Sequence, residues 1–338
     1  MRLKLIIASA TIVLFSLNLS IACKGQGQAD SALADSVVPP ITAPVQNVGN
    51  SMPNGFRNTQ NNHIVRAEKL DSFFSLIREK KRPVRIVHIG DSHVRGHVFS
   101  VVTRRRLEAA WGKEAVKPQD IDYKTTAIAQ ESGKAGLVYH AFGVNGALTQ
   151  HFLTKERLDK VAELKPDLVI VSFGTNEAHV NNYDAQAHCL AIIKLTDSIM
   201  ARCPETSILL TTPPGAFMSH KEPYTKKVKR KGKMVNKTFY NVSYKVNSNT
   251  PKAVLTIKNV ADSYALPLWN LYEICGGQTS ACNNWTGAGL MKDDHIHFKH
   301  EGYIVQGNLL AESILKAFNR YMEDLDLDLP ATISFNDF

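Results

Sequence analysis

The sequence predicts one doubly wound, three-layer α/β/α domain built around a parallel sheet. Short runs that are apolar on both faces alternate along the chain with stretches of helical periodicity, and there is no separate all-β block. Glycine-containing polar sequences follow several of these runs. A parallel sheet places its chemistry at the carboxyl ends of its strands, so these sequences are the first candidates for a site. We expect the domain to span residues 63–325.

The expected elements follow one another in strict alternation. Strands are predicted from the apolar runs at residues 84–89, 137–142, 168–173, 207–212 and 266–270. Helices are predicted from apolar residues spaced three and four apart at residues 67–80, 98–111, 149–163, 185–202, 251–264 and 301–323. This order indicates a single domain rather than two.

The first predicted strand ends in the run Gly90-Asp91-Ser92-His93, and the chain later contains Asp294-His295-Ile296-His297. A serine hydroxyl is a weak nucleophile until a histidine removes its proton, and that histidine needs a third group to orient it. Asp294 and His297, three residues apart, can supply this pair. The sequence therefore predicts a serine hydrolase with Ser92, His297 and Asp294 as its catalytic residues.

Two other strand ends offer hydrogen-bond donors for an oxyanion. The run Gly143-Val144-Asn145-Gly146 follows the second strand, and Gly174-Thr175-Asn176-Glu177 follows the third. We expect Gly146 to donate a backbone N–H and Asn176 its side-chain amide, although Gly143 is an alternative to Gly146. Glu177 is expected to orient its loop rather than to take part in the chemistry.

Taken together and in this order, the four blocks resemble those of the SGNH (GDSL-type) esterases and lipases, over roughly residues 84–320. The resemblance implies a flavodoxin-like sheet of five parallel strands, and a hydrolase that needs no metal or other cofactor. It also implies an oxyanion hole made by the Ser92 and Gly146 backbone amides and the Asn176 side chain. His93 replaces the leucine usual in the family, a variant similar to the branch that contains peptidoglycan O-acetylesterases. The expected substrate is an O-acetyl group on peptidoglycan or another polysaccharide, with His93 and Trp285 as candidate substrate contacts.

The chain begins with the features of a secretory leader. Residues 1–22 combine a positively charged start, an apolar stretch and a small-residue end. Cleavage before Cys23 would give a lipoprotein anchored in the membrane through that cysteine, whereas Ser20-Ile21-Ala22 also fits ordinary signal-peptidase cleavage. We favour the lipoprotein because residues 23–62 have the composition of a disordered tether. The expected location is the periplasm or cell envelope.

Four further cysteines are present. Cys189 and Cys203 lie at the two ends of one predicted helix and are therefore too far apart to pair. Cys275 and Cys282 flank what we expect to be a flexible loop, so they either form a disulfide or remain free thiols. The sequence leaves these two alternatives open.

Residues 224–246 are rich in lysine and contain several aromatic residues. A turn at Lys231-Gly232 would make this segment a protruding basic hairpin, with Lys229 and Arg230 as candidate substrate contacts. Lysines and aromatic rings also suit nucleic acid. Export instead favours an anionic polymer of the envelope and argues against nucleic acid as a partner. The alternative is an edge hairpin that its lysines keep soluble. We assign no role to the tail, residues 326–338.

Three other functions remain open. A lipase or lysophospholipase would use the same catalytic residues and differ only in its acyl pocket. A zinc hydrolase would use His295, His297 and His300 with neighbouring aspartates, or the pair His93 and His97, although that pair lacks the glutamate of a zinc helix. A non-catalytic glycan-binding protein would bind polysaccharide without turnover.

Overall fold

The computed structural model describes residues 52, 56, 61–96, 98–117 and 127–327. The chain divides into two compact units, Met1–Pro39 and Pro40–Phe338, and all of the described residues belong to the second. The predicted leader, Cys23, His97, nearly all of the tether and the tail after residue 327 lie outside the described residues. Among the described residues, no helix is both long and apolar enough to cross a bilayer.

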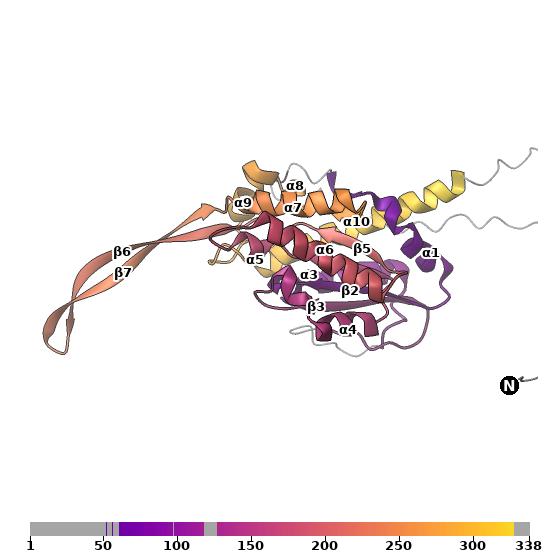
Figure 1. Cartoon of the computed structure of the whole chain (residues 1–338), viewed down its shortest axis with the longest axis horizontal. Helices are drawn as coiled ribbons and strands as arrows, with labels where there is room; N and C mark the ends of the chain where they lie inside the picture. The colour runs from indigo at the N-terminus through magenta and orange to yellow at the C-terminus, as the bar shows by residue number, and fades with distance from the viewer. Residues whose placement is uncertain (1–51, 53–55, 57–60, 97, 118–126, 328–338) are drawn as a thin grey trace, which may run out of the picture. The chain divides into compact units, whose positions relative to one another are not determined.

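A six-stranded sheet in the order β1-β8-β5-β4-β2-β3 forms the centre of the domain (Figure 1). Its members are β1 (Ile64–Val65), β2 (Pro83–Gly90), β3 (Gly136–Gly143), β4 (Leu168–Ser172), β5 (Ser207–Thr211) and β8 (Leu268–Trp269). The five strands from β8 to β3 are parallel, and their order confirms the flavodoxin-like prediction. The short β1 was not predicted, and it pairs antiparallel with β8 at one edge.

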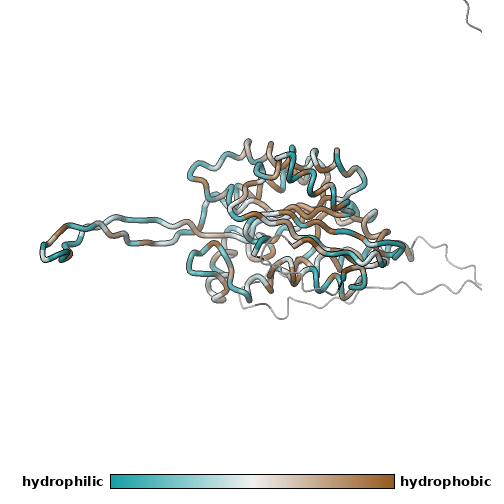
Figure 2. The backbone as a smooth tube through the Cα atoms, turned by 90° about the horizontal axis from the view of Figure 1, so that it is seen from below, coloured by the Kyte–Doolittle hydropathy of each residue, from teal (hydrophilic) through white to brown (hydrophobic). Residues whose placement is uncertain are grey.

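Helices cover both faces of the sheet because its strands are apolar on both faces. Alternate residues of β4 belong to different hydrophobic cores: Ile170 lies in one and Val171 in the other. The first core packs against α1 (Asp71–Glu79), α3 (Val98–Trp111) and α10 (His300–Leu327). The second packs against α4 (Lys155–Glu163), α6 (Ala185–Arg202) and α7 (Thr250–Ser263). The predicted three-layer α/β/α arrangement is therefore confirmed. Figure 2 shows that hydrophobic residues are concentrated in the strands between the helices.

The predicted helices are all present, with small changes at their ends. Predicted helices 98–111 and 185–202 coincide with α3 and α6. The start of the predicted helix 149–163 is a short 3-10 turn, η4 (Thr149–Phe152), ahead of α4. The remaining short elements are η3 (Ala67–Leu70), α2 (Ser92–Arg95), α5 (Thr175–Ala178), α8 (Leu271–Ile274) and α9 (Gly277–Gly287).

The basic segment is an antiparallel hairpin of β6 (Phe217–Arg230) and β7 (Lys233–Val246) that extends away from the α/β body (Figure 1). It begins seven residues earlier than the predicted segment, at Phe217 rather than at residue 224. Its turn is at Lys231-Gly232 as predicted, with φ of 50° and 82°. Two positive φ angles are typical of the two-residue turns that join tightly twisted hairpins.

The segment around Cys275 and Cys282 was wrongly predicted to be a flexible loop. After Gly276, which has a positive φ, the chain forms helix α9, starting at Gly277, and both thiols are buried and free. Cys282 donates a hydrogen bond to the carbonyl oxygen of Ala216 at 3.4 Å. Of the two alternatives for Cys275 and Cys282, the structure therefore shows free thiols. Cys189 and Cys203 are also free.

Candidate active site

Ser92 is the first residue of α2, directly after the carboxyl end of β2. Two glycines allow this short helix to lie close to the sheet. A Cβ atom at Gly90 would collide with the Val94 side chain of α2, and one at Gly143 with the Arg95 backbone nitrogen. Only glycine at these positions lets α2 hold Ser92 at the edge of the sheet.

The structure brings Ser92, His297 and Asp294 together although the serine is about two hundred residues from the other two. Ser92 Oγ lies 2.9 Å from His297 Nε2, and His297 Nδ1 lies 2.8 Å from Asp294 Oδ2. The three side chains form one hydrogen-bonded line. A nucleophile, a base and an orienting carboxylate require this geometry.

Asp294 is held by its own loop. Its Oδ1 accepts hydrogen bonds from the backbone N–H groups of Ile296 and His297, each at 2.9 Å. Partial burial alone would raise the pKa of Asp294, but these two N–H groups and the His297 side chain lower it to about 2. The carboxylate therefore stays ionised at neutral pH, and it can stabilise a positive charge on His297.

Gly146 and Asn176 lie beside Ser92 in one pocket of about 580 Å³. Gly146 has a φ of 66° and open space around its Cα. By contrast, Gly143 packs directly against the Arg95 backbone of α2. Asn176 Nδ2 donates to the Ala147 carbonyl oxygen at 3.0 Å and to Asp91 Oδ2 at a longer 3.4 Å. Gly146 is thus better placed than Gly143 to face a bound substrate.

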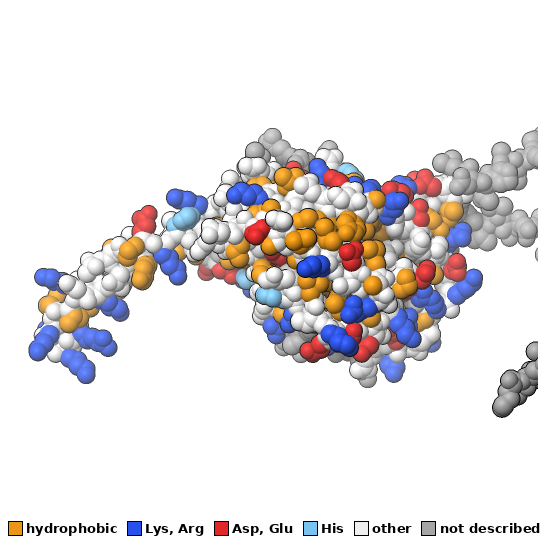
Figure 3. Space-filling model, in the orientation of Figure 1, with side chains coloured by type: hydrophobic (Ala, Val, Ile, Leu, Met, Phe, Trp, Pro, Cys, Tyr) orange, Lys and Arg blue, Asp and Glu red, His pale blue; other side chains and the backbone are white. Residues whose placement is uncertain are grey.

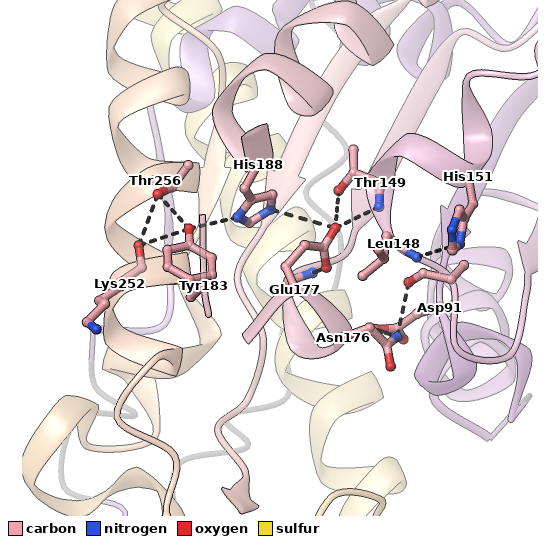
Figure 4. Close-up of polar contacts among 12 residues, drawn as sticks. Asp91, Leu148, Thr149, His151, Asn176, Glu177, Tyr183, His188, Lys252 and Thr256 are labelled. Carbon is pink, nitrogen blue, oxygen red and sulfur yellow. Dashed lines mark hydrogen bonds and ion pairs between the residues drawn. The ribbon is translucent and has the colours of Figure 1, made fainter. Parts of the chain in front are cut away.

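Glu177 connects the two loops that carry Gly146 and Asn176 (Figure 4). Its Oε1 accepts from both the backbone N–H and the hydroxyl of Thr149, each at 2.6 Å. Its Oε2 accepts from the Gly174 backbone N–H at 3.0 Å. Behind it, His188 Nε2 lies 3.8 Å from Oε1. The sequence indicated that Glu177 orients its own loop; the structure adds that it fixes the other loop as well.

Asp91, directly before Ser92 in the chain, is buried, and its side chain faces Asn176 (Figure 4). Its Oδ1 accepts from the His93 backbone N–H at 2.9 Å, which caps α2. Burial raises the pKa of Asp91 to about 8, with the His93 N–H offsetting part of the effect. At neutral pH this side chain is therefore largely uncharged, so it places little negative charge beside Asn176.

The candidate substrate contacts outside these loops are not at the pocket surface. His93 is buried, its Nδ1 lies 3.1 Å from the Tyr303 hydroxyl, and burial lowers its pKa to about 3. Trp285 is fully buried and donates to the Pro214 carbonyl oxygen, so the expectation that it lines the pocket is wrong. Lys229 and Arg230 lie beside the turn of the hairpin and do not line the pocket.

Several polar residues of the pocket were not singled out as substrate contacts from the sequence. Besides Ser92, Gly146, Asn176 and His297, it is lined by Gly96, Val98, Asn145, Lys292, Phe298, His300 and Tyr303. Lys292 precedes Asp293 and Asp294, and Asn145 precedes Gly146. Their positions next to predicted catalytic motifs were the sequence feature that could have identified them as pocket residues. Among them, Asn145, Lys292 and His300 place hydrogen-bond donors around the nucleophile.

The histidines do not form a metal centre in the described part of the chain. No group of three or more His, Cys, Asp or Glu side chains there is arranged to hold a metal ion. His297 is hydrogen bonded to Ser92 and Asp294, and His295 instead packs against Tyr244, with 4.1 Å between ring centroids. His97 of the other proposed pair lies outside the described residues.

Residues 89–305 match the model of the GDSL-like lipase/acylhydrolase family. No curated protein sequence matches the chain. A solved peptidoglycan O-acetylesterase has a TM-score of 0.57 and 18% sequence identity, and the match covers 75% of this chain and 96% of that one. This likeness shows a common fold.

Two other solved structures have lower TM-scores. A GDSL-like lipase from Bacteroides thetaiotaomicron VPI-5482 has a TM-score of 0.42 and 18% identity, over 71% of this chain and 90% of that one. An acetylxylan esterase from Geobacillus stearothermophilus, in a catalytic mutant, has a TM-score of 0.43 and 13% identity, over 68% and 94%.

Proposed function

Because the chain belongs to the GDSL-like lipase/acylhydrolase family and is a carboxylic ester hydrolase, we propose that it acts through Ser92, His297 and Asp294. The observation that carries this proposal is the hydrogen-bonded line from Ser92 Oγ through the His297 ring to Asp294, with distances of 2.9 and 2.8 Å. The base is within reach of the hydroxyl proton, and the carboxylate fixes the orientation of the base.

In the first half of the reaction, His297 Nε2 takes the proton from Ser92 Oγ as the oxygen attacks the ester carbonyl carbon. The C–O π electrons move to the carbonyl oxygen and give a tetrahedral oxyanion. Its collapse breaks the bond to the alcohol, which leaves with the proton from His297. Ser92 then carries the acyl group as an ester.

In the second half, water replaces the alcohol. His297 takes a proton from the water as its oxygen attacks the acyl carbon, and the second tetrahedral intermediate expels Ser92 Oγ. His297 returns the proton to that oxygen. The products are the free alcohol and the carboxylic acid, and the enzyme is restored.

The oxyanion of both intermediates would be held by the backbone N–H groups of Ser92 and Gly146 and by Asn176 Nδ2. The Ser92 N–H is in the first turn of α2, where backbone N–H groups have no partner within the helix. Asn176 would exchange its long contact with Asp91 for the oxyanion. The raised pKa of Asp91 supports this arrangement, because an ionised carboxylate there would repel the oxyanion.

For the substrate we propose an O-acetyl group on a polysaccharide of the cell wall. The pocket supports a polar alcohol part, since Asn145, Lys292 and His300 surround the nucleophile. The fold shared with a peptidoglycan O-acetylesterase is consistent with this choice. Steeply falling turnover from acetyl to longer acyl chains would support it, and a preference for long chains would favour a lipase.

We also propose that the protein is exported and anchored through lipidated Cys23. The apolar residues 5–22 with their positively charged start support export. Radiolabelled palmitate should be incorporated into the wild type in cells and not into Cys23→Ser. Equal labelling of both proteins would contradict the anchor.

The test of the esterase is acetate release from p-nitrophenyl acetate, O-acetylated peptidoglycan and acetylated xylan by wild type and by Ser92→Ala, each with and without EDTA. We expect release by the wild type to persist in EDTA, and the variant to be inactive on all three substrates. Release by Ser92→Ala at the wild-type rate would refute the mechanism. Release that EDTA abolishes would favour a metal hydrolase.

A further inference from the structure

The hairpin of β6 and β7 carries most of the excess positive charge of the protein. Residues 217–246 contain eight lysines and Arg230 but only one acidic residue, Glu222, and the whole chain has a formal charge of +9. Nearly all of these side chains are exposed, and Figure 3 shows Lys and Arg gathered towards the free end. None of the hairpin cations forms an ion pair with another described residue.

The strand register sorts the hairpin side chains onto two faces. Residues paired across the strands point to the same face, and successive pairs alternate between faces. One face carries five of the exposed large apolar side chains: Val246, Tyr244, Val242, Tyr240 and Met234. Lys221, Lys227 and Lys229 lie on this face too. We call it the aromatic face.

The aromatic face begins at the loop that carries the catalytic pair. Tyr244 packs on His295, between Asp294 and His297, with ring centroids 4.1 Å apart. Phe217, at the start of the same face, donates its backbone N–H to the His295 carbonyl oxygen at 3.0 Å. From this contact the face continues through Tyr240, which is 59% exposed, towards the lysines near the turn. It is thus an exposed surface that leads away from the triad loop.

We propose that the aromatic face and its neighbouring lysines are a docking surface for an anionic polysaccharide, a sugar polymer that carries carboxylate groups. The proposal rests on the proposed function, since such a polymer would bear the ester that Ser92 cleaves. The lysines complement the carboxylates, and the exposed Tyr rings, apolar with a polar tip, offer flat surfaces for sugar rings. Antiparallel pairing keeps these groups on one extended surface.

The distribution of side chains favours a polymer over a lipid bilayer. Four of the five apolar side chains of the aromatic face, residues 240, 242, 244 and 246, lie in the half nearest the body. The outer half is dominated by lysines and polar residues such as Asn236 and Thr238. A hairpin that inserted its end into a bilayer would require the opposite gradient, with its apolar side chains concentrated at the tip.

The test measures binding of the full-length protein to polygalacturonate and to the same polymer fully methyl-esterified. All proteins carry Ser92→Ala, so no ester is cleaved during the measurement. We expect binding to polygalacturonate that weakens roughly tenfold from about 50 to about 500 mM NaCl, because salt screens exposed charges. The methyl-esterified polymer should bind far more weakly.

Two triple variants locate the binding surface. Lys221→Gln, Lys227→Gln and Lys229→Gln, the three lysines of the aromatic face, together should weaken binding on the order of tenfold. The control, Lys113→Gln, Lys194→Gln and Lys258→Gln, removes the same charge from exposed positions of the α/β body and should bind like the parent protein. An equal loss in both variants, or equal binding of the two polymers, would refute the proposal.

Vesicles of phosphatidylcholine with about 30 mol% phosphatidylglycerol test the membrane alternative. Hairpin-dependent binding to vesicles without binding to polygalacturonate would overturn the proposal in favour of a lipid surface. The two proposals fail separately. An incorrect docking surface leaves p-nitrophenyl acetate turnover by the wild type intact, whereas an incorrect triad leaves polymer binding intact.

Discussion

At the scale of single residues, the charge of Asp91 is expected to control the alkaline limit of activity. Burial raises its pKa to about 8, so it becomes ionised beside Asn176 as the pH rises through that value. The negative charge would then oppose the oxyanion. We expect kcat of the wild type to fall above about pH 8, and the fall to disappear in Asp91→Asn, which keeps the acceptor for the His93 N–H.

The same residue links stability to pH. The folded pKa of Asp91 is above its ordinary value of 3.8, so ionisation favours the unfolded state. The wild type should lose stability as the pH rises from about 4 to about 8, and Asp91→Asn should lose less over that range. Thermal unfolding and kcat, both measured across this range and up to about pH 10, check the two effects. An identical alkaline limb in both proteins would contradict this role for Asp91.

Single residues were predictable from the sequence where a motif carries them. Ser92, Asp294 and His297 sit in short runs whose spacing follows from local backbone geometry, and the structure brings them together. Trp285 was misassigned because nearness in sequence to the catalytic pair does not decide which way a side chain points. Helix α9 turns it into the core, where it packs against Phe298 with ring centroids 4.8 Å apart.

At the scale of secondary-structure elements, the loops after β3 and β4 depend on Glu177 for their relative position. Glu177→Gln would replace one acceptor oxygen with a donor, opposite the N–H and hydroxyl of Thr149 or the N–H of Gly174. We expect kcat for p-nitrophenyl acetate to fall by roughly 10²-fold with little change in KM, because the oxyanion donors act mainly in the transition state.

Glu163→Gln is the matched control for this substitution. It makes the same chemical change at an exposed position of α4 and should leave both constants unchanged. A rise in KM at constant kcat in Glu177→Gln would indicate that Glu177 supports substrate binding instead of the oxyanion donors.

The close approach of α2 to β3 gives a second prediction at this scale. In Gly143→Ala the new methyl group would lie 2.2 Å from the Arg95 backbone nitrogen, so α2 and Ser92 must move. We expect a loss of about 1–3 kcal/mol in the free energy of unfolding, together with lower kcat. Gly287→Ala, at the end of α9 with nothing within 4 Å, should be neutral or slightly stabilising. Urea unfolding and turnover measure both variants, and equal stabilities would contradict the packing argument.

Most elements could be predicted because long apolar periodicity marks them. The short β1 could not: it contains two residues, and a two-residue strand is defined by its partner rather than by its own composition. The strand predicted at residues 266–270 is present, shortened to the two residues of β8. Helix α9 was predicted as a loop because Gly276 and Gly277 indicated flexibility. In the structure Gly276 caps the helix and Gly277 is its first residue.

At the scale of the whole molecule, the hairpin is separable from the catalytic centre. Replacing residues 221–242 with Asn-Gly would keep the contacts of Phe217 and Tyr244 with His295 while removing the basic arm. Turnover of p-nitrophenyl acetate should stay within about twofold of wild type, since the mutation leaves the triad loop supported. Turnover of an acetylated acidic polysaccharide should fall. Equal losses on both substrates would show instead that the arm holds the active site together.

The most direct test of the proposed mechanism is covalent trapping of the nucleophile with diethyl p-nitrophenyl phosphate, followed by intact-mass analysis and peptide mapping. The geometry predicts one diethylphosphoryl group per chain, located on Ser92. It should be absent in Ser92→Ala and should form roughly 10³-fold more slowly in His297→Asn, which lacks the base. An adduct on another residue, or equally fast labelling of Ser92→Ala, would contradict the assignment of Ser92 as the nucleophile.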